Sequence, residues 1–146
     1  MESVMVFGDG IGSVVSPQEQ SGNKGDVILH SHTESKHWNS GQTAKSLIKC
    51  VLDTSCIVKQ IVLSIRCAKF VTIKGGSSED DDSVLLLSRT ETGVNDNATY
   101  NGNLCEKTYD IYDPSIINVV TIELETGGNI SLFWVKVFGQ PRHIKK

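Results

Sequence analysis

The feature that most constrains the fold of this chain is an alternation of apolar and polar residues along several segments. From Val120 to Glu125 the two kinds of residue alternate strictly, and from Phe133 to Val137 apolar residues alternate with Trp134 and Lys136. A period of two is the signature of a β-strand with one buried face. No segment shows a helical period, so the sequence predicts an all-β fold.

Turn residues divide the chain into about eight expected strands with polar connections, as in sandwiches and jelly rolls. Asp53, Thr54 and Ser55 carry turn chemistry between two apolar runs, which predicts a hairpin there. One strand face is expected to hold Ile57, Ile61, Leu63, Ile65 and Cys67. The expected strands lie near Ser13–Val15, Ser46–Leu52, Cys56–Cys67, Phe70–Lys74, Val84–Arg89, Leu104–Tyr112, Ile116–Glu125 and Ile130–Phe138.

The chain length of 146 residues favours a single domain, which we place at residues 1–139 with a short basic tail at 140–146. A net charge of −3 and a pI near 5.8 argue against a nucleic-acid partner. The sequence shows neither a signal-peptide pattern nor an apolar run long enough to enter a membrane. We therefore expect a cytoplasmic location, with nucleus or cilium as alternatives, and reduced, buried thiols at Cys50, Cys56, Cys67 and Cys105.

The segment from Val27 to Gly41, which holds Trp38, Asn39 and Ser40, resembles the early signature of discoidin-like β-sandwiches of the galactose-binding-like, or F5/8 type C-like, family. The likeness continues through an Ile-rich strand at Ile57 to Ile65 and a last strand that ends in Gly139. It implies an antiparallel β-sandwich with jelly-roll topology. Within this family the chain most resembles the small intracellular members, such as the intraflagellar-transport discoidin-fold subunit. Those members act mainly as protein-interaction modules.

Secreted members of the family bind sugars or phospholipid head groups through loops at one end of the sandwich. Members with a structural calcium ion usually carry Asp about seven residues before the Trp, where Ser31 and His32 stand in this sequence. Because Ca²⁺ needs several oxygen ligands, the resemblance does not extend to that site. We therefore expect no cofactor.

Several motifs have a functional and a structural interpretation. His30, His32 and His37 suggest a metal contact, but no further ligand completes the set, so we expect surface histidines and no metal. We expect Glu79 to Asp82 to be a solvated loop, and Gly8 to Gly12 to be a flexible turn. Trp38 is interpreted as a core anchor rather than a platform for sugar stacking.

No nucleophile, base and acid stand in a recognisable arrangement, so we do not expect an enzyme. The first functional hypothesis is a protein-interaction subunit that contacts its partner through Leu132, Trp134 and Phe138, which form an outward apolar group on the last strand. The alternative is a lectin-like module that binds a small glycan, and a third hypothesis is a scaffold with a vestigial site. The residues expected to bind the glycan are Asn95, Asp96, Asn97, Tyr100 and Asn101.

Overall fold

Alternating residues form the expected strands in the computed structural model, which describes residues 3–8, 11–15, 38–39, 45–66, 68–92, 105–125 and 131–142. The described residues form antiparallel strands and contain no helix. This confirms the all-β class predicted from the period of two. The strands are β1 (Val4–Phe7), β2 (Ser13–Val15), β3 (Trp38–Asn39), β4 (Lys45–Arg66), β5 (Phe70–Gly76), β6 (Val84–Glu91), β7 (Cys105–Asp110), β8 (Ile116–Glu125) and β9 (Ser131–Pro141).

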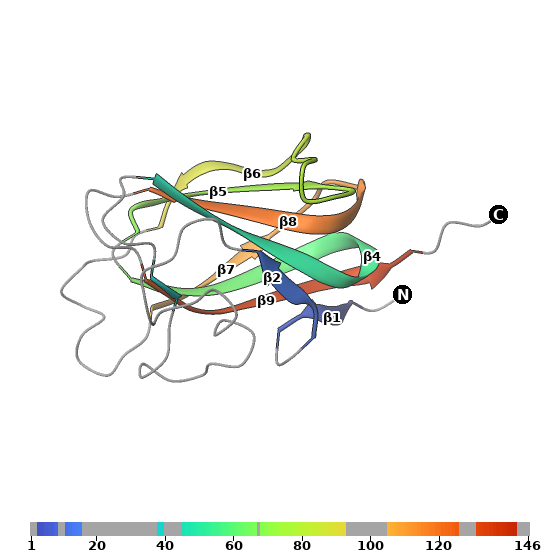
Figure 1. Cartoon of the computed structure of the whole chain (residues 1–146), viewed down its shortest axis with the longest axis horizontal. Coiled ribbons are helices and arrows are strands. Elements are labelled where there is room, and N and C mark those ends of the chain that lie inside the picture. Colours follow the sequence, from blue (N-terminus) through green and yellow to red (C-terminus); the bar gives the residue numbers. More distant parts are fainter. Residues whose placement is uncertain are drawn as a thin grey trace.

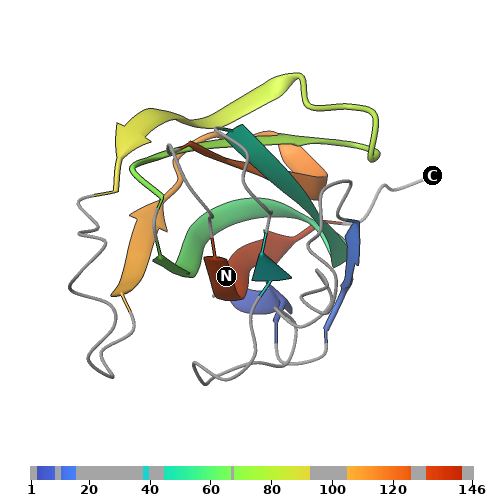
Figure 2. The ribbon, with the colours of Figure 1, turned by 60° about the vertical axis from the view of Figure 1, so that its left-hand side comes forward.

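Strand β4 belongs to both layers of the sandwich and joins them. Its first part, residues 45–51, pairs with β8 and β2, and β8 pairs onward with β5 and β5 with β6. Its last part, residues 56–66, pairs with β9 and β7, while Cys56 and Ile57 at its start also pair with β8; β9 pairs onward with β1 and β3. Figure 1 shows β4 crossing one layer, bending at one end of the molecule and returning in the other. We call these the β8 layer and the β9 layer, and Figure 2 shows them stacked.

The hairpin expected at Asp53 to Ser55 is wrong in its pairing. The chain bends there within strand β4, but its flanks do not pair with each other: the first pairs with β8, and the second pairs with β9 and, at Cys56 and Ile57, also with β8. The reason lies in the apolar residues on both flanks, since Cys50 and Cys56 are both fully buried. Two flanks that face each other across the core bury both sets of residues, whereas a hairpin would place them side by side in one layer.

The core lies between the layers and consists mainly of the alternating residues. Val120, Ile122 and Leu124 of β8 are fully buried, as are Val135 and Val137 of β9, which confirms the expected core faces. In β4 the expectation is wrong at Ile57, which is half-buried, because Val58 points into the core instead. A bulge between Val58 and Gln60 then shifts the register, so Ile61, Leu63 and Ile65 are buried as expected.

Two segments that were not expected to form strands, β1 and β3, complete the β9 layer by pairing with β9. β1 pairs with β9 antiparallel, and a turn closed by hydrogen bonds between Gly8 and Ile11 leads from it towards β2. Gly12 has a φ of +91°. A Cβ on Gly12 would lie 2.6 Å from the carbonyl oxygen of Val51, so only glycine fits there.

At the other end of the chain, β9 extends beyond the expected end at Phe138. It continues through Gln140 to Pro141, and the Arg142 amide donates a hydrogen bond of 2.8 Å to the carbonyl of Ser55. The first residues assigned to the tail therefore belong to the sheet. β5 likewise continues through Gly75 and Gly76, where we expected it to stop.

Candidate functional site

The outer surface of the β9 layer carries the aromatic residues singled out from the sequence. Val135 and Val137 point inward, so Trp134, Lys136 and Phe138 point outward, and both aromatic side chains are half-buried. The structure does not describe the side chain of Leu132, whose backbone pairs with that of Trp38. Two of the three expected contact residues therefore lie on one described surface.

Neighbouring strands extend this surface. Register pairs Met5 of β1 with Phe138, and Val62 of β4 with Lys136, so these side chains share one side of the layer. Gln60 lies beside Phe138 and donates a hydrogen bond of 3.3 Å to the carboxylate of Asp110 on β7. We call the set of Met5, Val62, Trp134, Lys136 and Phe138 the β9 face. It is an apolar strip with one cation near its centre and a polar margin at β7, and within it Val62 is only 9% exposed.

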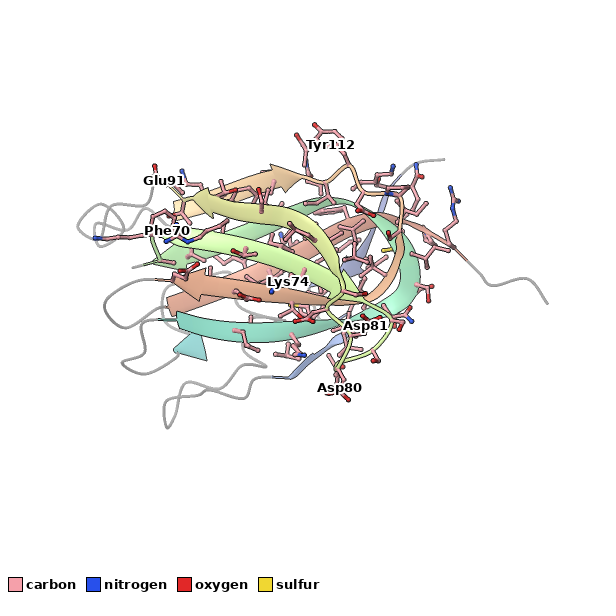
Figure 3. The ribbon with its side chains drawn as sticks, turned by 90° about the horizontal axis from the view of Figure 1, so that it is seen from above. Phe70, Lys74, Asp80, Asp81, Glu91 and Tyr112 are labelled. Atoms are coloured by element: carbon pink, nitrogen blue, oxygen red, sulfur yellow. The ribbon has the colours of Figure 1, made fainter. Side chains whose placement is uncertain are left out.

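The outer surface of the β8 layer is different in chemistry, and Figure 3 views it from above. Lys74 of β5 and Glu123 of β8 form an ion pair of 2.9 Å, and the Glu123 side chain is only 8% exposed. The hydrogen bond and the charge of Glu123 raise the pKa of Lys74 above its ordinary value. Glu123 was expected to face solvent, and its burial is explained by its position on a central strand, where neighbouring side chains cover it.

A second ion pair lies at the end of this layer marked by Phe70 in Figure 3. The guanidinium of Arg89 lies 3.6 Å from the centre of the Phe70 ring and 3.1 Å from a carboxylate oxygen of Glu125. Lys74 and Arg89 on this surface are thus each paired with a carboxylate of the same chain. Strand β5 lies between β6 and β8, and this order, which the pattern along a single strand does not reveal, brings Phe70, Arg89 and Glu125 together.

The expected solvated loop joins β5 to β6, and its residues 77–80, 82 and 83 are exposed. Asp81 organises it: one carboxylate oxygen accepts hydrogen bonds from the amide and hydroxyl of Ser77 at 3.0 and 2.9 Å, and the other accepts one from the Ser83 amide at 3.1 Å. These bonds, the one from the Ser77 amide most of all, lower the pKa of Asp81. Lys49 and Asn118 donate hydrogen bonds to the carbonyls of Glu79 and Ser77, which anchors the loop to β4 and β8.

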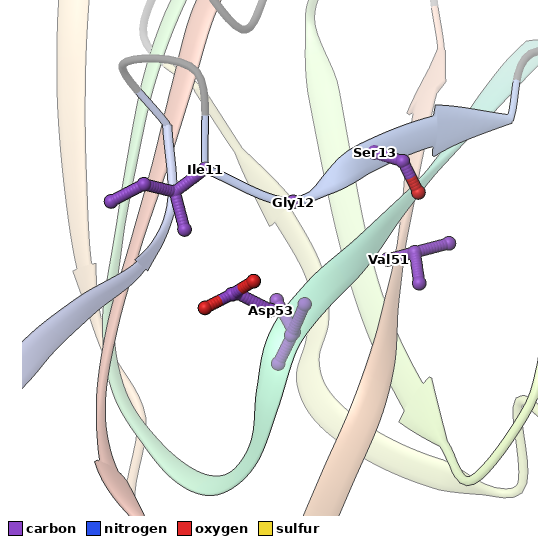
Figure 4. A pocket seen from close by; sticks show the side chains of 6 residues that line it. Ile11, Gly12, Ser13, Val51 and Asp53 are labelled. Atoms are coloured by element: carbon purple, nitrogen blue, oxygen red, sulfur yellow. The ribbon is translucent and has the colours of Figure 1, made fainter.

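A shallow pocket lies where β2 runs beside the bend of β4, and Figure 4 shows it from close by. Its polar groups are the Ser13 hydroxyl and the exposed carboxylate of Asp53. A single carboxylate in an open site offers little to hold a ligand firmly. The lining residues are Ile11, Gly12, Ser13, Val51, Leu52 and Asp53.

Other residues predicted from the sequence lie outside the described part of the chain. These are the expected glycan-binding residues Asn95, Asp96, Asn97, Tyr100 and Asn101, the histidines His30, His32 and His37, and Ser31. The side chain of Trp38 is also not described, so its expected role as a core anchor stays a prediction. Among the described residues, no three His, Cys, Asp or Glu side chains gather as metal ligands. The same residues include no helix long and apolar enough to cross a membrane.

Two of the cysteines are free and buried, as expected. Burial raises the pKa of Cys56 to about 11, and it raises that of Cys50 still further. Thiols with raised pKa values carry little thiolate and react slowly. Cys50 and Cys56 therefore serve as small core residues rather than as nucleophiles.

The two stacked antiparallel layers form a β-sandwich of the jelly-roll type. Its two outer faces differ, one being polar and the other apolar. No protein-family model matches the sequence. A search of curated proteins likewise finds no match. Solved structures, in contrast, match over nearly the whole chain.

The structure of reduced XRCC1 bound to the catalytic domain of DNA polymerase beta has 14% identity and a TM-score of 0.70, and the match covers 95% of this chain and 100% of that one. A chitosan-binding module of a chitosanase/glucanase from Paenibacillus sp. IK-5 has 13% identity and a TM-score of 0.69, with 92% and 99% covered. Allantoicase from Saccharomyces cerevisiae has 17% identity and a TM-score of 0.65, but the match spans 86% of this chain and only 40% of the allantoicase chain. These neighbours are galactose-binding-like β-sandwiches, so the fold expected from the discoidin-like resemblance is confirmed.

Proposed function

We propose that this chain is a non-catalytic binding module that recognises a protein partner through the β9 face. The observation that carries the proposal is the outward position of Trp134 and Phe138 on β9, a strand with paired neighbours on both sides. Aromatic residues are enriched at the centres of protein interfaces, where they supply most of the binding energy. Lys136 between them adds a charge that favours a partner with acidic residues around an apolar centre.

The contrast between the two layers supports this choice. On the β8 layer, Lys74 and Arg89 are already paired with carboxylates of the same chain. A partner would have to break these pairs or leave them buried, and both cost free energy. A partner that binds the β9 face would have to remove water from fewer charged groups. The fold likeness to XRCC1, whose structure was solved with the catalytic domain of DNA polymerase beta, is a further support.

The proposed location is the cytoplasm, with nucleus or cilium as alternatives, because the free and buried thiols of Cys50 and Cys56 suit a reducing compartment. The proposed absence of catalysis is supported by the chitosan-binding module, which the match covers almost completely.

Site-directed photo-crosslinking tests the β9 face. A photoreactive phenylalanine analogue is placed at Phe138, and in a control chain at Leu85 of β6, which is 53% exposed on the other layer. Each chain is incubated in extract of the source cell, and the crosslinked protein is identified by mass spectrometry and then purified. We expect crosslinking from position 138 and none from position 85.

Calorimetry with the purified partner gives the second half of the test. Trp134→Ala and Phe138→Ala are each expected to weaken binding by about 2 kcal/mol, roughly thirtyfold, as interface anchors do. Leu85→Ala should leave the affinity unchanged. The proposal is wrong if Leu85→Ala weakens binding and the two β9-face variants do not.

Carbohydrate binding is the second candidate, and the fold likeness to a chitosan-binding module is the observation that favours it. Asn95, Asp96, Asn97, Tyr100 and Asn101 remain the proposed glycan contacts. A glycan array that includes chitosan oligosaccharides tests it, followed by titration of any hit into a chain with Asn95 and Asn97 changed to Ala. Binding that survives both substitutions, or an array with no hit, removes this candidate.

A further inference from the structure

The β5–β6 loop contains three serines, and the structure distinguishes one of them. The Ser77 hydroxyl donates to Asp81 at 2.9 Å, and the Ser83 side chain also hydrogen bonds to Asp81. The Ser78 hydroxyl makes no hydrogen bond to another described residue, although its carbonyl accepts one of 3.1 Å from the Asp81 amide. Ser78 is exposed, as are Ser77 and Glu79 on either side of it. An unengaged hydroxyl is therefore held at the surface of an ordered loop.

The residues that follow Ser78 give this hydroxyl a chemical context. Four acidic residues come directly after it: Glu79, Asp80, Asp81 and Asp82. Kinases select their substrates largely by the charges that flank the acceptor hydroxyl. A run of acids immediately beyond the acceptor matches a substrate groove lined with Lys and Arg. We propose that Ser78 is a phosphorylation site for an acidophilic serine/threonine kinase.

The reaction is an ordinary phosphoryl transfer from Mg·ATP. The Ser78 Oγ forms a bond to the γ-phosphorus, the bond from that phosphorus to the β,γ-bridging oxygen breaks, and ADP leaves. The hydroxyl proton passes to the catalytic base of the kinase. The loop must present the hydroxyl and exposed acids beyond it; Glu79, Asp80 and Asp82 are exposed, whereas Asp81 is half-buried and uses its carboxylate within the loop. Figure 3 shows Asp80 and Asp81 at this end of the β8 layer.

A cation is already in place to receive the added charge. The Lys49 ammonium reaches from β4 and donates to the carbonyl of Glu79, the residue next to Ser78. A phosphate carries a charge of about −2 and would otherwise meet only acidic neighbours along the chain. Lys49 reduces that repulsion, so the folded loop tolerates the modification. Because the loop lies on the β8 layer, this proposal is independent of binding at the β9 face.

Phosphorylation of the purified full-length chain tests the proposal. The chain is incubated with Mg·ATP and casein kinase II, an acidophilic serine/threonine kinase, and intact mass and phosphopeptide mapping follow the product. We expect one phosphate at Ser78. Ser78→Ala should abolish incorporation, and Ser83→Ala should retain it. The double variant Glu79→Gln, Asp80→Asn should lower the initial rate by about tenfold.

Glu91→Gln, which removes an exposed acid at the opposite end of the β8 layer (Figure 3), is the matched control for charge and should keep the wild-type rate. Circular dichroism checks that each variant is folded. The proposal is overturned by a phosphate on Ser77 or Ser83 in place of Ser78, or by a double variant that reacts as fast as the wild type. It is also overturned if the folded chain takes up no phosphate while casein in the same mixture is phosphorylated.

Discussion

Replacing Ile122 by Ala tests the register of β8, on which the whole two-layer arrangement depends. Ile122 is fully buried and pairs with Ile48 of β4 and Ile73 of β5, both of which are also fully buried. The substitution removes three methylene equivalents, worth about 0.8 kcal/mol each in transfer free energy. The remaining cavity adds to this, since its walls relax only partly. We expect a loss of about 3 to 4 kcal/mol in the free energy of unfolding.

Ile116, on the same strand, is the matched control because it is 49% exposed. Ile116→Ala removes the same atoms but leaves no closed cavity, so we expect a loss of about 1 kcal/mol or less. Urea denaturation followed by tryptophan fluorescence measures both, and the midpoint should fall while the slope stays constant. If β8 were shifted by one residue, Thr121 and Glu123 would face the core. Equal losses at the two positions, or a loss below about 1 kcal/mol at Ile122, would therefore falsify the register.

Three further predictions concern the β8 layer. Gly76→Ala should destabilise the chain by about 1 to 3 kcal/mol and speed proteolysis in the adjacent loop, because the new Cβ would lie 1.9 Å from the Asp81 carbonyl oxygen. Thermal denaturation and limited digestion measure these two effects. An unchanged rate of cleavage in the loop counts against the prediction. Thr121→Val should stabilise by about 1 kcal/mol in urea denaturation, because the Thr121 hydroxyl is buried and has no hydrogen-bond partner among the described residues. Thr90→Val should not stabilise, because the Thr90 hydroxyl donates to the Ser88 carbonyl. Asp81 has a lowered folded-state pKa, so its stabilisation of the loop is complete above its unfolded-state pKa of about 4 and is lost as the pH falls further. The amide exchange rates of Ser77 and Ser83, measured relative to those in Asp81→Asn, should therefore increase only below that pH. Equal exchange rates in the two chains at every pH would contradict this.

The fold could be predicted from the sequence because burial repeats every two residues wherever a strand has one core face. Strand β8 was predicted with its observed limits for this reason. The limits of β2 were also predicted correctly, although that segment is too short to show a period. The prediction was wrong where a β-bulge changed the register. The bulge after Val58 reversed the expected orientation of Ile57, and no signal within the apolar run marks its position. The single strand β4 was divided into two because turn residues look alike in a hairpin and in a bend between layers.

The candidate site was less predictable because it depends on which strands lie side by side. The outward position of Trp134 and Phe138 follows from alternation along β9 alone. The apolar neighbours Met5 and Val62 come from β1 and β4, and their positions depend on pairing between segments far apart in the chain. The ion pair of Lys74 with Glu123 arises in the same way, from the pairing of β5 with β8.

Under the two proposals, the outer faces of one sandwich have separate roles, with binding on the β9 face and phosphorylation on the β8 layer. Folding requires only that the inner faces be apolar, so each outer face is free to take its own chemistry. On the β8 layer, Lys74 and Arg89 satisfy their charges within the chain, and four further acids gather in the loop that holds Ser78. On the β9 layer, Trp134 and Phe138 flank a single lysine. A partner that buries this strip leaves the loop accessible, so phosphorylation of Ser78 should proceed at the same rate in the free chain and in the complex.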